Sequence, residues 1–469
     1  MRQKTMLDVW VVDLTFPGYM TWWAERAREF EERHPDYEVD IVRLDFFSGP
    51  RDVSAAIEAG RRPAVAEYYF YLNQVARDTL APDGSPQFTS VEAAVGGRAE
   101  ILGEPVVLGD IIPALREYYS DDGLTSMPSV GTTSVLYGNA GVLESAGASR
   151  MPRTWGDVED TCEAVAGLAG GPAHGITWSN HGMFFQQALA AQGGLLTDND
   201  NGRSGRATTI DLAAPEMLAW ARWWRRLHRR GHYLYTGRIP DWQGTFQAFA
   251  DERTALRLSS SNDVDYMVQA AKTAGFGLDV GACPYNGDVP HAGNAVAGSS
   301  LWLSDRLDER TRDGALAFLQ FVHNPRNAAD RHKRMSFLPL TGSAFALLEE
   351  EGWFAANPHH RVPSEQLAAA PGEGGRERGP AARGAMFGNF ARIQDIMTRA
   401  MHDVLVDDVD VTGRFARATA EARLRLREYN SKAPAIAPGG VESLCVEFFT
   451  DAGSYSGADL EKVAELRRR

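Results

Sequence analysis

The beginning of the chain follows a strand–helix–strand pattern, and this pattern limits the possible folds more than any other feature of the sequence. Residues 7–14 are rich in Val and Trp and predict a strand. Trp23, Ala27 and Phe30 then recur at the spacing of a helix face buried on a sheet, and residues 38–45 predict a second strand. A unit of this kind is the right-handed crossover of an α/β fold.

Strands and helices continue to alternate along the 469 residues, which predicts the α/β fold class for the whole chain and two or three domains. The clearest helix covers residues 215–228, where apolar side chains share one stripe. Thr154 and Asp157 predict a capping box at another helix start. Near the end, residues 411–429 predict a long helix with Thr412 as its N-cap.

The charge balance restricts the partners that the protein can have. There are 62 acidic and 48 basic residues, which gives a net charge of −14. A surface this acidic repels phosphate backbones and anionic lipid, so we expect no nucleic-acid partner. No apolar run reaches the roughly 18 residues that a membrane-spanning helix needs, so we expect no membrane span.

The cysteines and the N-terminus bear on the compartment. Cys162, Cys283 and Cys445 are too few for a disulfide scaffold, and an odd count is typical of a reducing compartment. Residues 1–12 are too short and too charged for a secretory leader. The sequence as it stands therefore predicts a cytoplasmic protein; a leader removed before residue 1 would make it extracellular or membrane-associated, and both alternatives stay open.

Common catalytic and nucleotide-binding motifs are missing from the sequence, so we expect no metal and no cofactor. Residues 198–202 resemble a calcium loop, but the Gly comes one position early and no Glu occupies the twelfth position, so a surface turn is the better interpretation. Aromatic and small polar residues instead gather at the predicted strand ends. In α/β sheets ligands bind outside the carboxyl ends of the strands, so this pattern favours a site for a neutral polyol or an amphiphilic molecule.

Several segments carry a family resemblance. Residues 292–348 (AGNAVAGSSLWLS…GALAFLQFVHNP…FLPLTGSAFALLEEEGW), with residues 126–139, 152–155 and 388–394, resemble the carbohydrate-type extracellular solute-binding proteins of ABC transporters. The glycerol-3-phosphate-binding branch is the most similar, and the resemblance covers about residues 7–430.

The resemblance implies a two-lobed, type II periplasmic-binding-protein-like clamshell with hinge crossovers between its lobes. On this basis we expect residues 1–127 with 289–336 to form the first lobe. Residues 128–288 with 337–430 would form the second, helix-rich lobe, and residues 431–469 a C-terminal extension.

Family ligand positions, together with the strand-end pattern, give a candidate binding site. Its residues are Asp13, Tyr69, Phe70, Thr132, Trp178, Trp242, Ser260, Ser261, Asn262, Gly298, Ser299, Phe337 and Gln394. Three of these depart from the glycerol-3-phosphate branch: Phe70 replaces a Glu, Phe337 a hinge Tyr, and Gln394 an anion-pairing Arg. An Arg is the natural partner of a phosphate, so we expect a small neutral ligand, sugar-like or amphiphilic, in an aromatic cleft.

Two functions follow from this interpretation. The first is a monomeric solute-binding protein, with an ABC permease as its partner if it is exported. The second is a cytosolic homologue in specialised-metabolite biosynthesis, which either binds its molecule or acts as a cyclase or isomerase that traps one conformer without metal or nucleotide. The candidate catalytic groups for the second function are His181, Asp241, Asp263 and Gln394.

Overall fold

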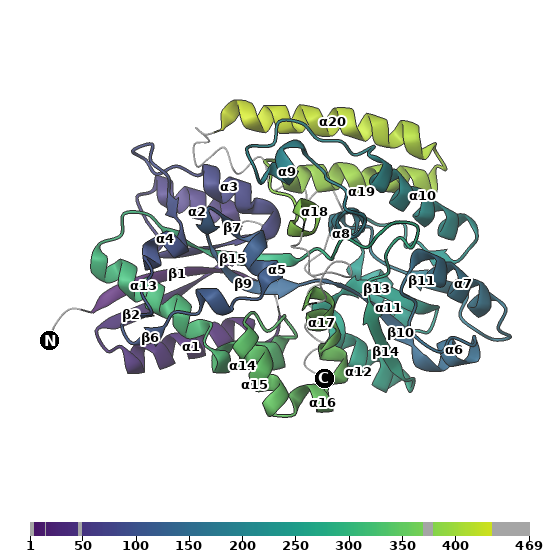
Figure 1. Ribbon diagram of the computed structural model, residues 1–469, viewed down its shortest axis with the longest axis horizontal. Helices are drawn as coiled ribbons and strands as arrows, with labels where there is room; N and C mark the ends of the chain where they lie inside the picture. The colour runs from purple at the N-terminus through teal and green to yellow at the C-terminus, as the bar shows by residue number, and fades with distance from the viewer. Residues whose placement is uncertain (1–3, 15, 46–48, 369–378, 434–469) are drawn as a thin grey trace.

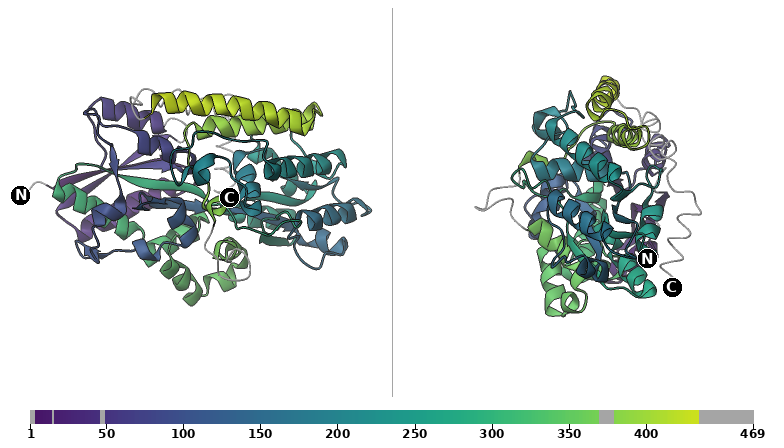
Figure 2. Two further views of the ribbon diagram at one scale, coloured as in Figure 1. Left: turned by 45° about the horizontal axis from the view of Figure 1, so that its top comes forward. Right: turned by 90° about the vertical axis from the view of Figure 1, so that its right-hand side faces the viewer.

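The computed structural model describes residues 4–14, 16–45, 49–368 and 379–433, and these residues form two α/β lobes side by side (Figure 1). Residues 434–469, which make up most of the expected C-terminal extension and include Cys445, lie outside the described residues. The molecule is elongated when seen from the side and compact when seen end-on (Figure 2).

The first lobe is built on a six-stranded sheet. Its path is β2-β1-β3-β15-β4, and β9 pairs with the free part of β15. The strands are β1 (Thr5–Asp13), β2 (Tyr37–Asp45), β3 (Val65–Tyr69), β4 (Phe88–Thr89), β9 (Met127–Thr132) and β15 (Ala297–Ser304). Its helices include α1 (Tyr19–Arg33), α2 (Gly49–Glu58), α3 (Asn73–Asp78), α4 (Val91–Val95), α5 (Pro113–Tyr118), α13 (Glu309–Val322) and α14 (Pro325–Met335).

The second lobe is built on a five-stranded sheet of order β12-β11-β13-β10-β14. Its strands are β10 (Ser134–Asn139), β11 (His174–Thr177), β12 (Tyr233–Leu234), β13 (Thr254–Ser260) and β14 (Leu278–Ala282). Its helices are α6 (Ala140–Ser145), α7 (Trp155–Ala166), α8 (Gly182–Gln192), α9 (Asp198–Gly202), α10 (Pro215–Arg229), α11 (Trp242–Ala250) and α12 (Val264–Ala274). Two sheets with helical layers confirm the α/β prediction.

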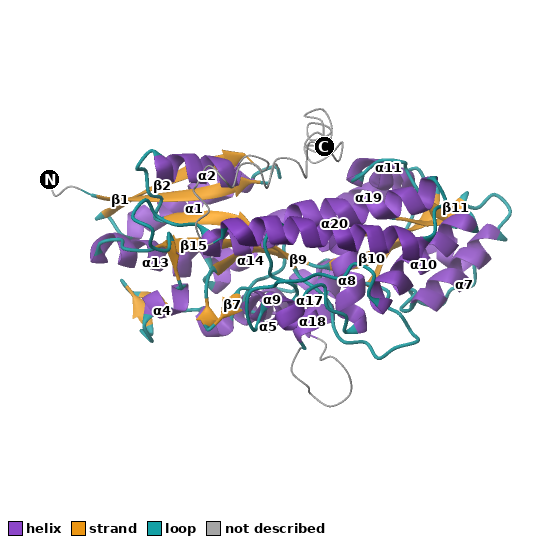
Figure 3. Ribbon diagram, turned by 90° about the horizontal axis from the view of Figure 1, so that it is seen from above, coloured by secondary structure: helices purple, strands orange, loops and turns teal. Residues whose placement is uncertain are grey.

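Short elements complete the chain. They are the strands β5 (Glu100–Ile101), β6 (Glu104–Pro105), β7 (Ser120–Asp121) and β8 (Gly123–Leu124), and the 3₁₀ turns η1 (Phe70–Leu72), η2 (Leu108–Asp110), η3 (Ser261–Asp263) and η4 (Pro358–His360). The C-terminal helices are α15 (Gly342–Glu350), α16 (Trp353–Ala356), α17 (Val362–Ala368), α18 (Pro380–Arg383), α19 (Phe390–Val406) and α20 (Val411–Lys432). The last two pack against each other and extend over both lobes (Figures 1 and 3).

The chain passes between the two sheets at neighbouring positions. β9 ends at Thr132 and β10 begins at Ser134, so only Thr133 separates a strand of the first sheet from a strand of the second. β15, which returns from the second lobe, pairs antiparallel with β9, with Ala297 opposite Thr132. Because β9 belongs to the first sheet, the crossover lies about five residues after the predicted boundary at residue 128. The lobe assignment of the other segments stays a prediction.

Local signals in the sequence were accurate at one helix start and misleading at another. Thr154 Oγ1 accepts from the Asp157 N–H and Asp157 Oδ2 accepts from the Thr154 N–H, each at 3.0 Å, so the predicted capping box is confirmed. The prediction of Thr412 as N-cap is wrong, because Asp410 caps α20 by accepting from the Gly413 N–H at 2.7 Å. The Asp410 carboxylate precedes the helix and can accept from the free N–H groups of its first turn. Thr412 lies inside the helix, so its hydroxyl is not placed to cap them.

Candidate functional site

The end of β3 and the start of β15 lie beside the crossover between the two sheets. Tyr69 lies opposite Ser299 in the ladder that joins these strands. Ser299 is fully buried, and its hydroxyl donates to Glu67 Oε1. Glu67 Oε2 accepts from the Val12 N–H at 2.8 Å, so Glu67 connects three strands. The Ser299 hydroxyl thus has a partner within the lobe, and its contact with a ligand stays a prediction.

Predicted site residues from three distant segments meet at the crossover. The Ser261 N–H donates to the Thr133 carbonyl at 2.8 Å, and Ser261 Oγ accepts from the Thr133 N–H at 3.1 Å. Gly298 has φ of 139°, and a Cβ there would lie 2.0 Å from the Val130 carbonyl oxygen, so only Gly fits this position. These backbone contacts place the predicted residues Thr132, Ser260, Ser261, Asn262 and Gly298 around one crossing point.

The second lobe contributes the N-terminus of α8. His181 caps this helix, and its Nδ1 accepts from the Met183 N–H at 3.2 Å, which leaves the ring proton on Nε2. Burial lowers the pKa of His181 to about 4, so the ring is neutral at pH 7. The half-buried Trp242 ring lies 5.1 Å from the His181 ring and 5.6 Å from the Phe184 ring. The result is an aromatic wall beside a helix N-terminus.

Gln394 reaches the same place from α19. Its side chain is fully buried, and neither amide atom has a hydrogen-bond partner among the described residues. A Cβ on Gly182 would lie 2.3 Å from Gln394 Oε1, so the amide lies directly against the first residue of α8. A buried amide without partners is costly unless a ligand or water satisfies it. Sequence reasoning missed Gly182, because only the packing of α19 on α8 reveals why this position must lack a side chain.

Two other predicted catalytic groups have structural partners. Asp241 Oδ1 caps α11 by accepting from the Gly244 N–H at 2.8 Å. Asp263 accepts from Arg257 at 2.8 Å and from the Ser259 hydroxyl at 2.6 Å. These contacts give both carboxylates a structural role, and their catalytic roles stay predictions.

Four of the predicted ligand residues have structural contacts of their own. Trp178 is inside the second lobe with 1% of its surface exposed, and its ring stacks on Trp223 at 5.6 Å. Phe337 packs against Phe16 of the first lobe at 5.1 Å. Asp13 pairs with Arg43 at 2.6 Å. Phe70 is buried against Tyr118 and Phe390, where η1 meets α19. Their ligand roles stay predictions.

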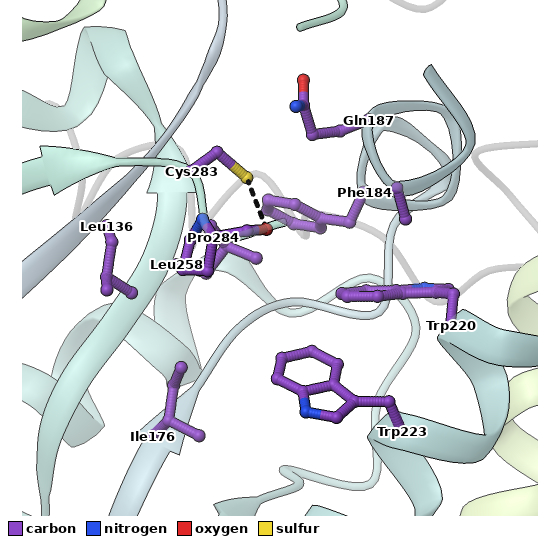
Figure 4. A pocket seen from close by; sticks show the side chains of 10 residues that line it. Leu136, Ile176, Phe184, Gln187, Trp220, Trp223, Leu258, Cys283 and Pro284 are labelled. Atoms are coloured by element: carbon purple, nitrogen blue, oxygen red, sulfur yellow. Dashed lines mark hydrogen bonds between the residues drawn. The ribbon is translucent and has the colours of Figure 1, made fainter. Parts of the chain in front are cut away.

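A small pocket lies inside the second lobe, between its sheet and helices α8 and α10 (Figure 4). Its walls are apolar, with Leu136, Ile176 and Trp223 among them. The one amide in the lining, that of Gln187, is already bonded to Asn294 and Ala295. Burial raises the pKa of the Cys283 thiol, so this sulfur is a core atom rather than a nucleophile. The pocket is a packing gap of the core.

One serine, one histidine and one aspartate meet at the end of α14, but their geometry differs from that of a hydrolase triad. Asp265 Oδ1 lies 3.0 Å from His360 Nε2, and Asp265 Oδ2 accepts from the Ser336 hydroxyl. The same His360 nitrogen faces both Asp265 and Ser336, whereas a triad histidine needs one nitrogen for each partner. The group therefore ties α12 to the end of α14.

Two further findings concern membranes and metals. Among the described residues, no helix combines the length and the hydrophobicity that a membrane crossing requires. The same residues contain no group of three His, Cys, Asp or Glu side chains placed to hold a metal ion.

Comparison with known proteins gives the family and the fold. Residues 25–362 match the family described as "Bacterial extracellular solute-binding protein". The chain is 26% identical over 392 residues to the sn-glycerol-3-phosphate-binding periplasmic protein UgpB of Salmonella typhimurium, covering 81% of this chain and 83% of the relative.

Solved structures agree in fold at lower identity. The sugar-binding protein MalE of Xanthomonas citri superposes with a TM-score of 0.72 at 17% identity, covering 91% of this chain and 98% of that one. UgpB of Mycobacterium tuberculosis, in complex with glycerophosphocholine, gives a TM-score of 0.65 at 20% identity, covering 91% and 99%. These neighbours confirm the type II periplasmic-binding-protein clamshell. Since the family match covers more than half of the sequence, this chain belongs to the bacterial extracellular solute-binding proteins.

Proposed function

We propose that this protein is the substrate-binding component of an ABC importer, that it works on the outer side of the cytoplasmic membrane, and that it binds a neutral, hydroxyl-rich solute of the sugar class. The single observation that carries the choice of ligand is the buried amide of Gln394 at the N-terminus of α8, which has no hydrogen-bond partner within the described part of the chain. An amide presents one acceptor and two donor hydrogens, which suits hydroxyl groups that both donate and accept.

The surroundings of Gln394 support a sugar face rather than a charged group. The half-buried Trp242 ring and the neutral His181 ring lie together, and aromatic faces pack well on the apolar faces of sugars. The nearby Arg257 guanidinium is bonded to Asp263, so its charge is already compensated. A phosphate in this place would need an uncompensated cation.

The relatives give two ligand classes, and the site favours one of them. UgpB is named for sn-glycerol-3-phosphate, and one solved neighbour from Arthrobacter globiformis is a cyclic alpha-maltosyl-1,6-maltose binding protein, with a TM-score of 0.70 at 16% identity. Gln394 stands where the resemblance places an anion-pairing Arg, which supports the sugar class. None of the comparisons supports the alternative of a cyclase or isomerase.

Calorimetry tests the proposal. Maltose, maltotriose, glycerol-3-phosphate and glycerophosphocholine are titrated into the protein. We expect a maltose-type sugar to bind and Gln394→Ala to weaken it about tenfold or more, since a lost buried hydrogen bond is worth about 1.5 kcal/mol. The matched control is Gln269→Ala on the exposed face of α12, which should leave affinity unchanged.

The opposite ligand preference would contradict the neutral-ligand proposal. If glycerol-3-phosphate or glycerophosphocholine binds and neither sugar does, the proposed solute-binding function stands and the proposed sugar class of ligand is wrong. A double variant, Gln394→Arg with Phe70→Glu, sharpens this test, because it should gain affinity for glycerol-3-phosphate if these positions contact the ligand.

A further inference from the structure

A buried carboxylate of the first lobe is held by groups from two other segments. Asp78, the last residue of α3, is 5% exposed. Arg206 donates to both of its oxygens, from Nη2 to Oδ1 at 2.5 Å and from Nη1 to Oδ2 at 2.9 Å. The Tyr429 hydroxyl donates to Oδ2 at 2.8 Å. A bidentate arginine–carboxylate pair with a third donor is among the strongest polar contacts in proteins.

The segment that carries Arg206 is attached to the second lobe through α20. Ala207 accepts from the Asn430 side chain at 2.8 Å, and Ile210 accepts from the Arg423 guanidinium at 2.9 Å, both through their carbonyls. The Leu212 N–H donates to the Thr419 hydroxyl at 3.0 Å. Helix α20 in turn packs on α10, which covers the second sheet. Arg206 and Tyr429 therefore reach Asp78 from the side of the second lobe.

A second arginine of the same segment makes a parallel bridge. The Arg203 guanidinium donates to the carbonyls of Tyr118 at 2.7 Å, Arg383 at 2.8 Å and Gly384 at 2.9 Å. Its charge also lies 4.8 Å from the centre of the Tyr118 ring. Tyr118 belongs to α5 of the first lobe, so the two arginines connect the same pair of bodies.

We propose that Asp78, Arg206 and Tyr429 form a clasp that holds the two lobes in the arrangement of this structure, and that Asp78 thereby acts as a positioning residue for ligand affinity. The contacts join groups that are carried by different lobes, so they favour the arrangement in which α3 and the 203–210 segment are within reach of each other. An interaction present in one of two conformations shifts their populations and, with them, the apparent affinity for any ligand that binds the two conformations unequally. No ligand contact by Asp78 is required.

The experiment measures lobe separation in the ligand-free protein, so it does not depend on the identity of the ligand. Spin labels are attached to Ala59→Cys, just after α2, and Gln247→Cys, on α11, in a Cys445→Ser background. Helices α2 and α11 lie on the same side of opposite lobes (Figure 3). Double electron–electron resonance then gives the label–label distance distribution.

We expect Asp78→Asn to lower the population of the lobe arrangement seen here, relative to all other arrangements, by about tenfold or more, since a charge-assisted pair is lost. The matched control is Asp121→Asn, which breaks the 2.8 Å contact with Arg77 within the first lobe and should leave the distribution unchanged. Tyr429→Phe, which removes one hydroxyl, should give a smaller shift in the same direction.

A distribution for Asp78→Asn and Tyr429→Phe that matches the parent, with a folded circular dichroism spectrum, would overturn the clasp. If Asp78→Asn fails to fold, Tyr429→Phe and Arg206→Lys decide the question by the same measurement. A lower melting temperature without any change in distance would also overturn it, since it would make these contacts part of a single rigid body.

Discussion

The interiors of the two lobes differ in chemistry, although each is a sheet covered by helices. In the first lobe, charged and titratable side chains are buried beside the sheet, among them Glu67, Arg331 and His332. Burial raises the pKa of Glu67 and lowers that of Arg331 to about 10. The second lobe also buries charged side chains, that of Arg257 among them, but beneath α10 its interior is filled by indole rings, with Trp178 stacked on Trp223 and near Trp224. The comparison teaches that aromatic residues at strand ends serve the core as readily as a ligand.

The largest effect should come from the aromatic interior. Trp178→Ala removes a fully buried ring that packs on several others, so we expect a loss of about 3–5 kcal/mol in the free energy of unfolding. Urea denaturation followed by circular dichroism measures it. The control is Leu424→Ala, at an exposed position of α20, which should change the free energy of unfolding only slightly. A small stability loss together with a large loss of sugar affinity would instead return Trp178 to the binding site.

The next effect concerns the buried carboxylate of the first lobe. Glu67→Gln presents an NH₂ group to one of two donors, the Val12 N–H or the Ser299 hydroxyl, so we expect a loss of about 1–3 kcal/mol. Glu100→Gln, on an exposed strand, is the matched control. Equal denaturation midpoints for the two variants would show that the polar interior contributes no more than the surface does.

A pH titration of stability tests the buried histidines, of which His332 lies in the first lobe and His181 in the second. Burial lowers the pKa of His332 to about 4, below the 6.5 of an unfolded histidine, so the unfolded chain binds the extra proton first as pH falls. Stability should therefore decrease between about pH 6.5 and 4, by up to about 2 kcal/mol at pH 5 from this residue.

His332→Gln should flatten this part of the pH profile. Chemical denaturation at pH 7 and pH 5 provides the comparison. An unaltered pH dependence in His332→Gln would place the titrating groups elsewhere.

The smallest effect should be the same in both lobes. Thr154→Ala removes the N-cap of α7. Asp308→Ala removes the N-cap of α13, where Asp308 Oδ1 accepts from the Thr311 N–H at 3.0 Å. Each should cost about 1 kcal/mol in unfolding free energy, and Thr154→Ser should restore most of it. Clearly unequal losses would mean that the lobes differ in more than their interiors.

The candidate site was predictable in part. The residues at the crossover, including Gly298 and Ser261, could be found because strand ends meet at one edge of a sheet. Gln394 and Trp242 were also named in advance, and the structure brings them near His181. Gly182 was missed, because a glycine at a helix start gives no local sign that a side chain from a distant helix occupies its place.

What the sequence determined by itself was local: the strand–helix alternation, the capping box at Thr154, and the segments that carry the family resemblance. These depend on neighbours within a few residues, so periodicity and residue type suffice to predict them. The tertiary structure alone decided that Trp178 lies in the core, that the Gln394 amide has no hydrogen-bond partner among the described residues, and that Arg206 reaches Asp78 across 128 residues of chain. Such contacts depend on the three-dimensional arrangement of distant segments, which a single sequence read along its length does not contain.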